Sequence, residues 1–349
     1  MGIAKKWQKL KAMGCFFAKK QNPAFAVYDY IHKKTKYGIH ADVYFKLGLD
    51  SIPIANLASY VSYDEYVDII ENKINNDLEA QKILRDKGTT LRRLPPHLLK
   101  REFLDLRFCT FEDFYSFVNR HPKIVVKVYN SAMGDQVNVV DTEREQLTGL
   151  ANQEKLARVF ADYQSKSLYI IEEYIHQHHE WSLINPDCVN TIRVHTVKSA
   201  DGQYAACWHW LARFGRKGES IDMHNAFVAL VDPDSGRIIT DALDEEIGGR
   251  EWFLQGEAQM KEMNEAANVR FKDVVVPFKD EIKAVVEEAA AYFPEIPFIG
   301  WDIALSEEGP VIVEGNGCPV AFKPIQQLYA TINGGVFYRA ELENVMKKI

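Results

Sequence analysis

The pattern of apolar and polar positions divides the chain into a helical first part and a second part of short strands. Residues 41–107 have helical periodicity, and one apolar face of this region is marked by Tyr66, Ile69, Ile70 and Ile74. The periodicity breaks at Pro95-Pro96, before an aromatic-rich stretch at residues 103–117. The later apolar runs are short and lie between turn residues, as in strands. The pattern therefore predicts a boundary near residue 100, an amphipathic helix at residues 280–292 and a last helix from about residue 341.

Two apolar runs at residues 298–305 and 311–313 flank a polar connection that contains Gly and Pro. This is the pattern of an antiparallel hairpin. If the hairpin is centred on Glu308, Leu305 faces Val311.

The same centring places Asp302 opposite Glu314. Opposed side chains stand roughly 5 Å apart at Cβ, and two like charges so placed repel each other unless a cation neutralises them. Because side chains alternate along a strand, Asn316 follows Glu314 on the same side. Two carboxylates and an amide oxygen suit a hard cation such as Mg2+. The alternative is a surface hairpin whose charges are separated by a different register.

A lysine lies inside the β-rich run at residues 124–128, where a buried ammonium needs a partner. A small-residue loop at 130–136 and a second β-rich run at 137–140 follow. Such a hairpin can cover a polyphosphate with backbone N–H groups while Lys127 neutralises its charge. The alternative is a lysine that extends from an edge strand beside an ordinary turn.

Residues 168–175 form a β-rich run that ends in an acidic pair, Glu172-Glu173, followed by Tyr174 and Ile175. The end of such a strand offers backbone groups at the rim of an apolar slot, as an adenine ring requires. Three histidines follow closely, His176, His178 and His179. We interpret them as a polar surface loop and not as metal ligands, because the sequence offers no second cluster.

Residues 190–197 alternate as a half-buried strand does, with Thr191, Arg193 and His195 on one face. Residues 204–214 form its antiparallel partner across the Asp201-Gly202 turn and bring Arg213 into the same sheet. The planar fork of an arginine is suited to phosphate or carboxylate, and an ordinary salt bridge is the alternative for Arg213.

Composition is that of an ordinary globular protein, with 349 residues, 26% charged and 47% hydrophobic. No apolar run reaches eighteen residues and no signal sequence is evident, so we expect a cytoplasmic protein. Five scattered cysteines, without C-x-x-C spacing, predict free thiols, and Cys318 is expected to be a buried structural thiol.

Charge is uneven, since residues 1–40 carry a net charge of +8 and the rest of the chain −15. The acidic main part disfavours nucleic-acid binding. In the N-terminal stretch, lysines alternate with apolar residues, namely Trp7, Leu10, Met13, Phe16 and Phe17. This pattern predicts a solvated or domain-packed amphipathic helix, and contact of residues 1–40 with an anionic membrane surface or a partner is the alternative.

Four phrases together resemble the sugar-transfer associated branch of the ATP-grasp superfamily. They are V-N-T-I-R-V-H-T at 189–196, V-D-P-D-S-G at 231–236, I-G-W-D-I-A at 299–304 and V-E-G-N at 313–316. The resemblance covers roughly residues 65–340 and implies an ATP-grasp fold of class α+β, in which two α+β subdomains clasp ATP after a mainly helical N-terminal region. The implied cofactors are ATP and Mg2+, with Mn2+ as a substitute.

The resemblance also implies roles for particular residues. Lys127 matches the lysine that contacts the α-phosphate, and Arg193 matches the arginine near the γ-phosphate. The metal ligands match Asp302, Glu314 and Asn316. The adenine hinge matches Glu172, Glu173, Tyr174 and Ile175, with backbone groups from Glu172 and Ile175, and Glu180 is placed like the acid that binds the ribose.

The chain departs from the family in two places. The loop after the lysine keeps only Gly134, whereas relatives usually have more glycine there. Residues 222–227 read D-M-H-N-A-F where relatives tend to have Asp-Asn followed by a Gly-Gly pair, which questions whether the chain uses the same substrate.

The implied domains are a basic helical extension at 1–60, a mainly helical region at 61–110, a small subdomain at 111–178 with the lysine strand and hinge, and a large subdomain at 179–349 with the metal-binding hairpin. The implied function is an ATP-dependent carboxylate-amine ligase that forms an amide through an acyl phosphate, in cell-surface polysaccharide or glycoconjugate synthesis. Arg213 is a candidate to hold the substrate carboxylate. The alternatives are a phosphotransferase with the same site and a non-catalytic nucleotide-binding scaffold.

Overall fold

The computed structural model describes residues 3–18, 21–46, 49–50, 52–129, 137–166, 169–218, 226–244, 260–317 and 322–349. Three features of the sequence lie outside these described residues. They are the loop at 130–136, Cys318, and residues 222–225 of the D-M-H-N-A-F segment. Cys15, Cys109, Cys188 and Cys207 are free thiols, as predicted.

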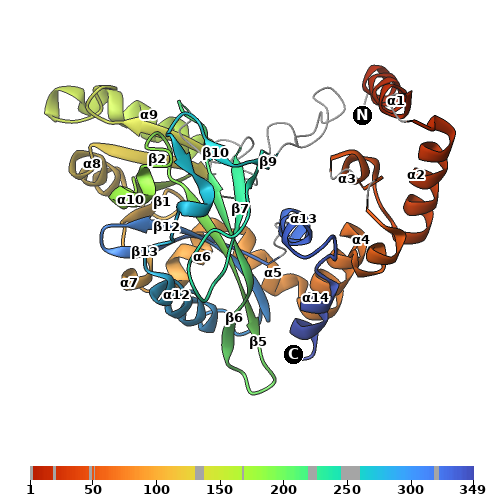
Figure 1. Ribbon diagram of the computed structural model, residues 1–349. Coiled ribbons are helices and arrows are strands. Elements are labelled where there is room, and N and C mark those ends of the chain that lie inside the picture. The colour runs from red at the N-terminus through yellow and green to blue at the C-terminus, as the bar shows by residue number, and fades with distance from the viewer. Residues whose placement is uncertain are drawn as a thin grey trace.

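The described chain before the first strand is helical (Figure 1). Its elements are α1 Ile3–Ala18, α2 Pro23–Tyr37, α3 Ala41–Lys46, η1 Ile54–Ser59, α4 Tyr63–Val67, η2 Asp68–Ile74, α5 Leu78–Arg85, α6 Lys87–Arg93 and α7 Pro96–Leu99. Local sequence sets the ends of α2, because the Asn22 side chain accepts a hydrogen bond from the N–H of Phe25, and Gly38 ends the helix at a φ of 64°. The predicted helical N-terminal region is confirmed.

A four-stranded antiparallel sheet forms the smaller of the two main sheets, in the order β1-β4-β2-β3. Its strands are β1 Phe103–Asp105, β2 Lys123–Val128, β3 Val137–Asp141 and β4 Tyr169–Glu173. One face packs on α8 (Phe111–Arg120) and α9 (Gln153–Lys166), which follows the short η3 (Leu150–Asn152). Since Ile171 packs on that face, its neighbour Glu172 lies on the opposite face, and Lys127 shares this face through the β2–β4 register.

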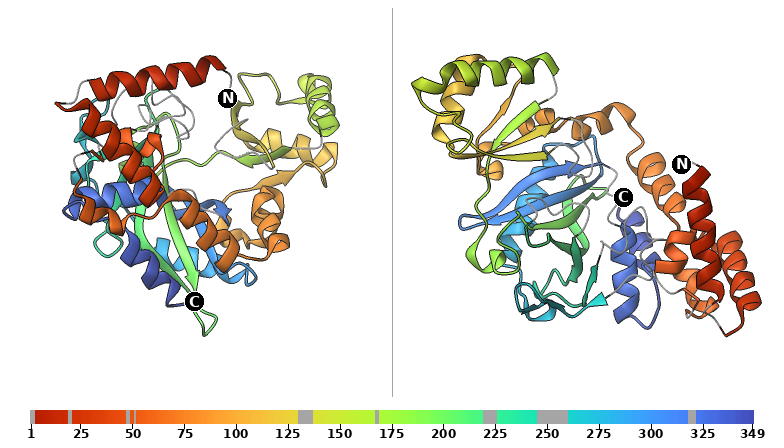
Figure 2. Two further views of the ribbon diagram at one scale, coloured as in Figure 1. Left: turned by 90° about the vertical axis from the view of Figure 1, so that its right-hand side faces the viewer. Right: turned by 90° about the horizontal axis from the view of Figure 1, so that it is seen from above.

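A seven-stranded sheet forms the centre of the molecule, in the order β13-β12-β5-β6-β7-β8-β9 (Figure 1). Its strands are β5 Thr191–Lys198, β6 Tyr204–Phe214, β7 Phe227–Val231, β8 Ala242–Asp244, β9 Met260–Lys261, β12 Phe298–Ser306 and β13 Gly309–Asn316. A separate small hairpin pairs β10 (Met263–Asn264) with β11 (Val269–Arg270), and η4 (Phe271–Asp273) follows. Figure 2 shows the four-stranded sheet and the N-terminal helices on different sides of the seven-stranded sheet.

Helices cover both faces of the large sheet. Helix α12 (Lys279–Ala291) packs Ile282 and Val286 into the same core as Ile192 and Trp301. The opposite core contains Leu211 of β6, together with side chains of α13 (Phe322–Ile332) and α14 (Arg339–Met346). Because Leu211 pairs directly with Arg193, Arg193 lies on the α13 face of the sheet. None of the described helices is long and apolar enough to cross a bilayer.

The predicted local elements are largely present. The β2–β3, β5–β6 and β12–β13 hairpins and helix α12 are confirmed. Residues 237–240 are β-rich in sequence and a strand is the simplest prediction there, but the structure has only isolated bridges from Arg237 to Val275 and from Ile238 to Val231. Helix α13 was not anticipated, although it supplies much of one core.

Candidate functional site

The acidic hairpin has the pairing expected from its sequence but a different centre. Asp302 lies directly opposite Glu314, as predicted. Leu305, however, pairs with Pro310 and not with Val311, because a tight turn brings Ser306 opposite Gly309. A β-bulge between the pairs of Asp302 and Ile303 then restores the register by one residue. The two carboxylates therefore share one face of the sheet.

Arg193 from β5 completes a row of charged side chains across three strands, because it pairs with Asp302 on the other side from Glu314. Its Nε lies 2.5 Å from Asp302 Oδ1 and its Nη2 lies 2.7 Å from Oδ2. Burial would lower the pKa of Arg193, but the charge of Asp302 outweighs it and raises that pKa. The fork of Arg193 thus neutralises Asp302 in this structure.

Glu314 is held much more loosely than Asp302. Its Oε2 lies 3.6 Å from Lys87 Nζ, and its Oε1 lies 3.5 Å from the side-chain amide of Asn316. A quarter of its side chain is exposed. The donor set of Asp302, Glu314 and Asn316 consists of carboxylate and amide oxygens, which fits Mg2+.

On the small sheet, Lys127 and Glu172 form a second charged group with Arg101. Lys127 Nζ lies 3.0 Å from Glu172 Oε1, and Arg101 Nη2 lies 2.7 Å from Glu172 Oε2. Burial alone would raise the pKa of Glu172, but Arg101 and Lys127 outweigh it and lower the pKa to about 2. The lysine that the sequence placed in an apolar run therefore has its partner on the neighbouring strand.

Arg101 also connects the two sheets. Its Nη1 donates to the carbonyl of Ile312 at 2.5 Å and its Nη2 to the carbonyl of Val313 at 3.3 Å, both on β13 just before Glu314. A single side chain thus joins the Lys127–Glu172 pair to the strand that carries Glu314. This contact brings the two predicted charged groups to one region of the molecule.

The predicted hinge residues lie at the end of β4. Glu172 sits inside the sheet, in register with Phe103 on one side and Val125 on the other. The amides of Glu173 and Tyr174 donate to the carbonyls of Glu102 and Lys123. Among the described residues, no acceptor is found for the amide of Ile175. Ile175 is therefore the better placed of the two residues expected to offer backbone groups to adenine.

The side chains of Tyr174, Glu173 and the predicted ribose acid Glu180 have different surroundings. Tyr174 lies under Lys123, whose Nζ is 3.8 Å from the ring centre. Glu173 accepts a hydrogen bond from the N–H of Glu102 and is partly exposed. Glu180 is exposed on the one-turn helix α10 (His179–Ser182), directly after the hinge.

Arg213 and His195 lie on the same face of the β5–β6 hairpin as Arg193, one on either side of it. Arg213 pairs with Thr191, two positions along from the Leu211–Arg193 pair, so it lies on the same face as Arg193. Further along this face, His195 packs against Trp208 and Phe298. Burial, with Arg193 nearby, lowers the pKa of His195 well below its usual value, which makes His195 a neutral core residue.

A family model matches residues 58–331, which is more than half of the chain, and its description is sugar-transfer associated ATP-grasp. The chain belongs to this family. Its fold is the ATP-grasp fold preceded by a helical region, as the sequence resemblance implied. No curated protein sequence matches the chain.

Solved structures similar to this ATP-grasp chain include the D-alanine–D-alanine ligase from Bacillus anthracis, the D-alanyl-alanine synthetase A from Vibrio cholerae and the ATP-grasp ligase PsnB with its minimal precursor. Each is 13% identical to the chain, with TM-scores of 0.40, 0.43 and 0.42. They match 77%, 77% and 78% of this chain, which in turn covers 68%, 66% and 62% of theirs. The chain thus spans less than two thirds of the latter two. The family membership rests on the match over residues 58–331, to which these structures add no argument.

Sequence reasoning missed two basic residues that contact the candidate site. Arg101 meets Glu172 and Ile312, which lie 71 and 211 positions away in the chain. Lys87, at the start of α6, approaches Glu314 from a helical region that shows no chemical motif. In the sequence, each of them is only a basic residue in a helical region. Their contacts with β13 become visible only in the folded chain.

Proposed function

We propose that the chain is an ATP-dependent carboxylate-amine ligase with its site between Lys127 and the Asp302–Glu314 pair. The observation that carries the proposal is the row of Arg193, Asp302 and Glu314 across three strands, joined through Arg101 to Lys127 and Glu172. Oxygen ligands for a cation in the same region as the positive side chains of Lys127 and Arg193 are suited to a triphosphate. Family membership supports the use of ATP in general.

In the proposed reaction, an oxygen of the substrate carboxylate attacks the γ-phosphorus of ATP and ADP leaves. The amine then attacks the carbonyl carbon of the acyl phosphate, phosphate leaves and a proton is released, so that an amide forms. Mg2+, or Mn2+ in its place, supplies charge neutralisation between the phosphates when bound. The chain itself needs no nucleophile, and its task is to position the reactants and neutralise their charge.

The side chains have distinct tasks in this proposal. Lys127 contacts the α-phosphate. Glu172, which is itself paired with Arg101, holds the Lys127 side chain in place. Arg193 faces the γ-phosphate, and Asp302, Glu314 and Asn316 hold the metal. Glu173, Tyr174 and Ile175 line the adenine, Glu180 binds the ribose, and Arg213 holds the substrate carboxylate.

Asp302 would hold a metal ion beside its ion pair with Arg193. Each oxygen of Asp302 accepts one hydrogen bond from Arg193 in this structure. A carboxylate oxygen has a second lone pair, which could face a cation while Arg193 stays in place. The buried carboxylate would then be neutralised with or without the metal, which limits the cost of its burial.

The test is ADP release measured over a matrix of carboxylic acids crossed with amino acids and amino sugars, with and without Mg2+. The ligase predicts ADP release that requires both an acid and an amine, together with an amide product. A stable phosphorylated product formed without an amine supports the phosphotransferase instead. Nucleotide binding without turnover for any pair supports the scaffold.

The family description points to polysaccharide or glycoconjugate assembly, and amino sugars and sugar acids are therefore the first substrates to test. The proposed place of action is the cytoplasm, where ATP is plentiful. We keep the division at residues 60, 110 and 178 as part of the proposal, with strand β1 (Phe103–Asp105) joining the small sheet from the preceding region.

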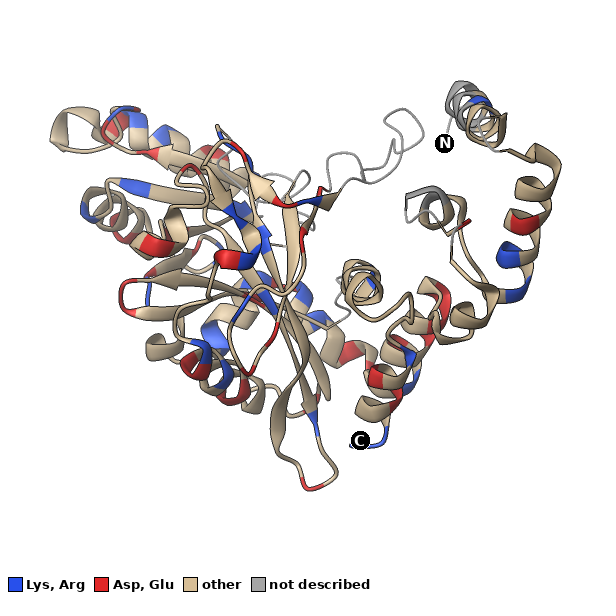
Figure 3. Cartoon of the chain, in the orientation of Figure 1, with Lys and Arg blue, Asp and Glu red and all other residues tan. Residues whose placement is uncertain are grey.

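We further propose that α1 and α2 contact an anionic membrane surface. Helix α2 buries Ala26 and Tyr30 on one side and exposes Phe25, Tyr28 and Ile31 by more than half on the other. On α1, Trp7 is 69% exposed and Leu10 58%. Figure 3 shows that Lys and Arg outnumber Asp and Glu on the described parts of these two helices. Exposed aromatic and apolar residues beside lysines favour a negatively charged lipid interface.

Co-sedimentation with vesicles tests this contact. We expect binding to phosphatidylserine-containing vesicles, loss of binding at high salt, and loss in a variant that carries Trp7→Ser and Phe25→Ser. Equal binding to neutral vesicles, or none to either kind, contradicts the proposal. Retained ADP release in the same variant shows that the protein is still folded.

A further inference from the structure

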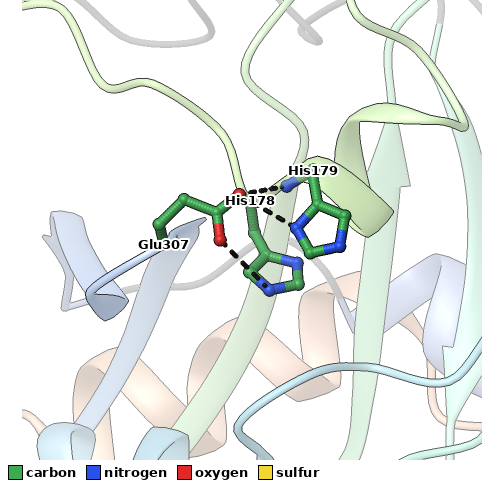
Figure 4. Close-up of side chains that lie close together, drawn as sticks. All are labelled: His178, His179 and Glu307. Carbon is green, nitrogen blue, oxygen red and sulfur yellow. Dashed lines mark hydrogen bonds and ion pairs between the residues drawn. The ribbon is translucent and has the colours of Figure 1, made fainter.

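Two of the three clustered histidines meet a glutamate from a distant part of the chain. His178 and His179 follow the hinge, and Glu307 lies at the turn between β12 and β13. Figure 4 shows the Glu307 carboxylate beside the two imidazole rings, with one oxygen toward each ring. The sequence predicts a polar surface loop for these histidines and does not anticipate the contact with Glu307, which comes from a distant hairpin.

The distances in this cluster suit a small metal ion. Glu307 Oε1 lies 3.0 Å from His179 Nδ1, and Oε2 lies 3.6 Å from His178 Nε2. One potential ligand atom from each residue lies within 4.8 Å of the others. A tetrahedral ion with bonds of about 2.0–2.2 Å places its ligand atoms roughly 3.3 Å apart.

The ring of His178 is buried, but neither of its nitrogens has a hydrogen bond to a described residue. Its side chain is 10% exposed, and no described residue is a hydrogen-bond partner of its Nδ1. Its Nε2 faces Glu307 at a distance longer than a hydrogen bond. A metal ion between Nε2 and Glu307 would give Nε2 a partner, whereas Nδ1 has none among the described residues with or without the ion.

The backbone holds His178 in this position. Its N–H donates to the carbonyl of Leu305 at 2.8 Å, and its ring packs edge-on against Phe278 at 5.3 Å between centroids. The N–H of His179 donates to Glu307 Oε1 at 2.8 Å. The contacts with Leu305 and Phe278 hold His178 in position. The hydrogen bond from His179 holds the Glu307 carboxylate near the His178 ring.

We propose that His178, His179 and Glu307 bind a transition-metal ion of the zinc type. Two imidazoles and one carboxylate favour Zn2+, Co2+ or Ni2+ over Mg2+, which prefers oxygen ligands. His179 and Glu307 are mostly exposed, so water completes the coordination on the solvent side. The ion links the segment after the hinge to the turn of the hairpin that carries Asp302 and Glu314. This proposal is independent of the proposed ligase activity.

The experiment is a Co2+ titration of the protein without nucleotide and without a histidine tag, followed by visible absorption. We expect one Co2+ per chain with ligand-field bands, and displacement of these bands by Zn2+. His179→Ala and Glu307→Gln should each weaken binding at least about tenfold. Both residues are exposed, so folding of these variants is expected, whereas a change at buried His178 carries more risk.

Two matched variants complete the test. His176→Ala removes an exposed histidine from the same segment, and Glu314→Gln removes a carboxylate from the other metal site. Both should keep Co2+ binding within about twofold of the unchanged protein. If the unchanged protein binds no Co2+ at millimolar concentration, the cluster is only an ion pair and the proposal is overturned. It is also overturned if His176→Ala or Glu314→Gln abolishes binding.

Discussion

Glu172 and Glu314 are both acidic residues of the site, but their surroundings differ. Glu172 is fully enclosed and has an arginine and a lysine within 3.0 Å, so its charge is balanced inside the protein. Glu314 has one lysine at 3.6 Å and is a quarter exposed. A balanced buried group is a fixed part of the framework, whereas a loosely held carboxylate remains available to a cation. The difference indicates that Glu172 fixes the position of Lys127 on the small sheet, while Glu314 on the hairpin has room to meet a cation.

The largest effect is expected from removal of the hairpin carboxylates. Asp302→Ala together with Glu314→Ala should reduce turnover by at least about 10^3-fold, because several kcal/mol of charge stabilisation are lost. The measurement is ADP release with a substrate pair found in the matrix. Glu308→Gln, an exposed change in the turn of the same hairpin, should leave turnover nearly unaltered. Similar rates in all three proteins contradict the assigned metal site.

A large loss of stability is expected at the enclosed acid. Glu172→Gln leaves Arg101 and Lys127 without their counter-charge and should lower the free energy of unfolding by about 3–5 kcal/mol. Urea unfolding followed by circular dichroism measures this change. The control is Glu173→Gln, next to it and partly exposed, which should cost less than about 1 kcal/mol. Equal losses in both variants mean that Glu172 is not the balanced centre described here.

The pH dependence of stability provides the next contrast. The pKa of Glu172 is about 2 in the folded protein and 4.5 without the fold. Ionised Glu172 therefore stabilises the fold fully above about pH 4.5, and this contribution, about 3 kcal/mol, is lost as pH falls toward 2. Unfolding free energies measured between about pH 5 and pH 3 should fall more steeply for the unchanged protein than for Glu172→Gln. Parallel curves contradict this assignment.

The smallest effect is expected for the loss of the Asn316 amide, the one uncharged ligand in the proposed Mg2+ site. Asn316→Ala should raise the Mg2+ concentration needed for half-maximal ADP release by about tenfold, because it removes one neutral ligand and keeps both carboxylates. Glu314→Gln should raise it further, since a charge is lost. An Asn316→Ala effect as large as that of Glu314→Gln rules out this order of importance.

Local patterns account for the parts of the site that were predicted correctly. Turn residues and alternation placed β12 against β13 and Asp302 against Glu314. The bulge that corrects the register was not foreseen, because the Leu305–Pro310 pairing depends on how tightly the turn closes. The same limit applies to the cluster at His178, whose third ligand lies 129 positions away at Glu307.

Contacts between distant segments account for what was missed. Arg101 lies directly after α7, and its partners on β4 and β13 are brought to it only when the two sheets are in place. The ion pair of Arg193 and Asp302 likewise depends on β5 lying beside β12. Sequence patterns name these charged residues but do not show which charges are already balanced in the folded chain.

We expect a divalent cation to bind with nucleotide between Asp302 and Glu314. Electron paramagnetic resonance of Mn2+ with a non-hydrolysable ATP analogue measures this binding directly. We expect a bound-Mn2+ signal that requires the analogue and is lost in the Asp302→Asn, Glu314→Gln double variant. An unchanged bound-Mn2+ signal in that variant would contradict this cation site.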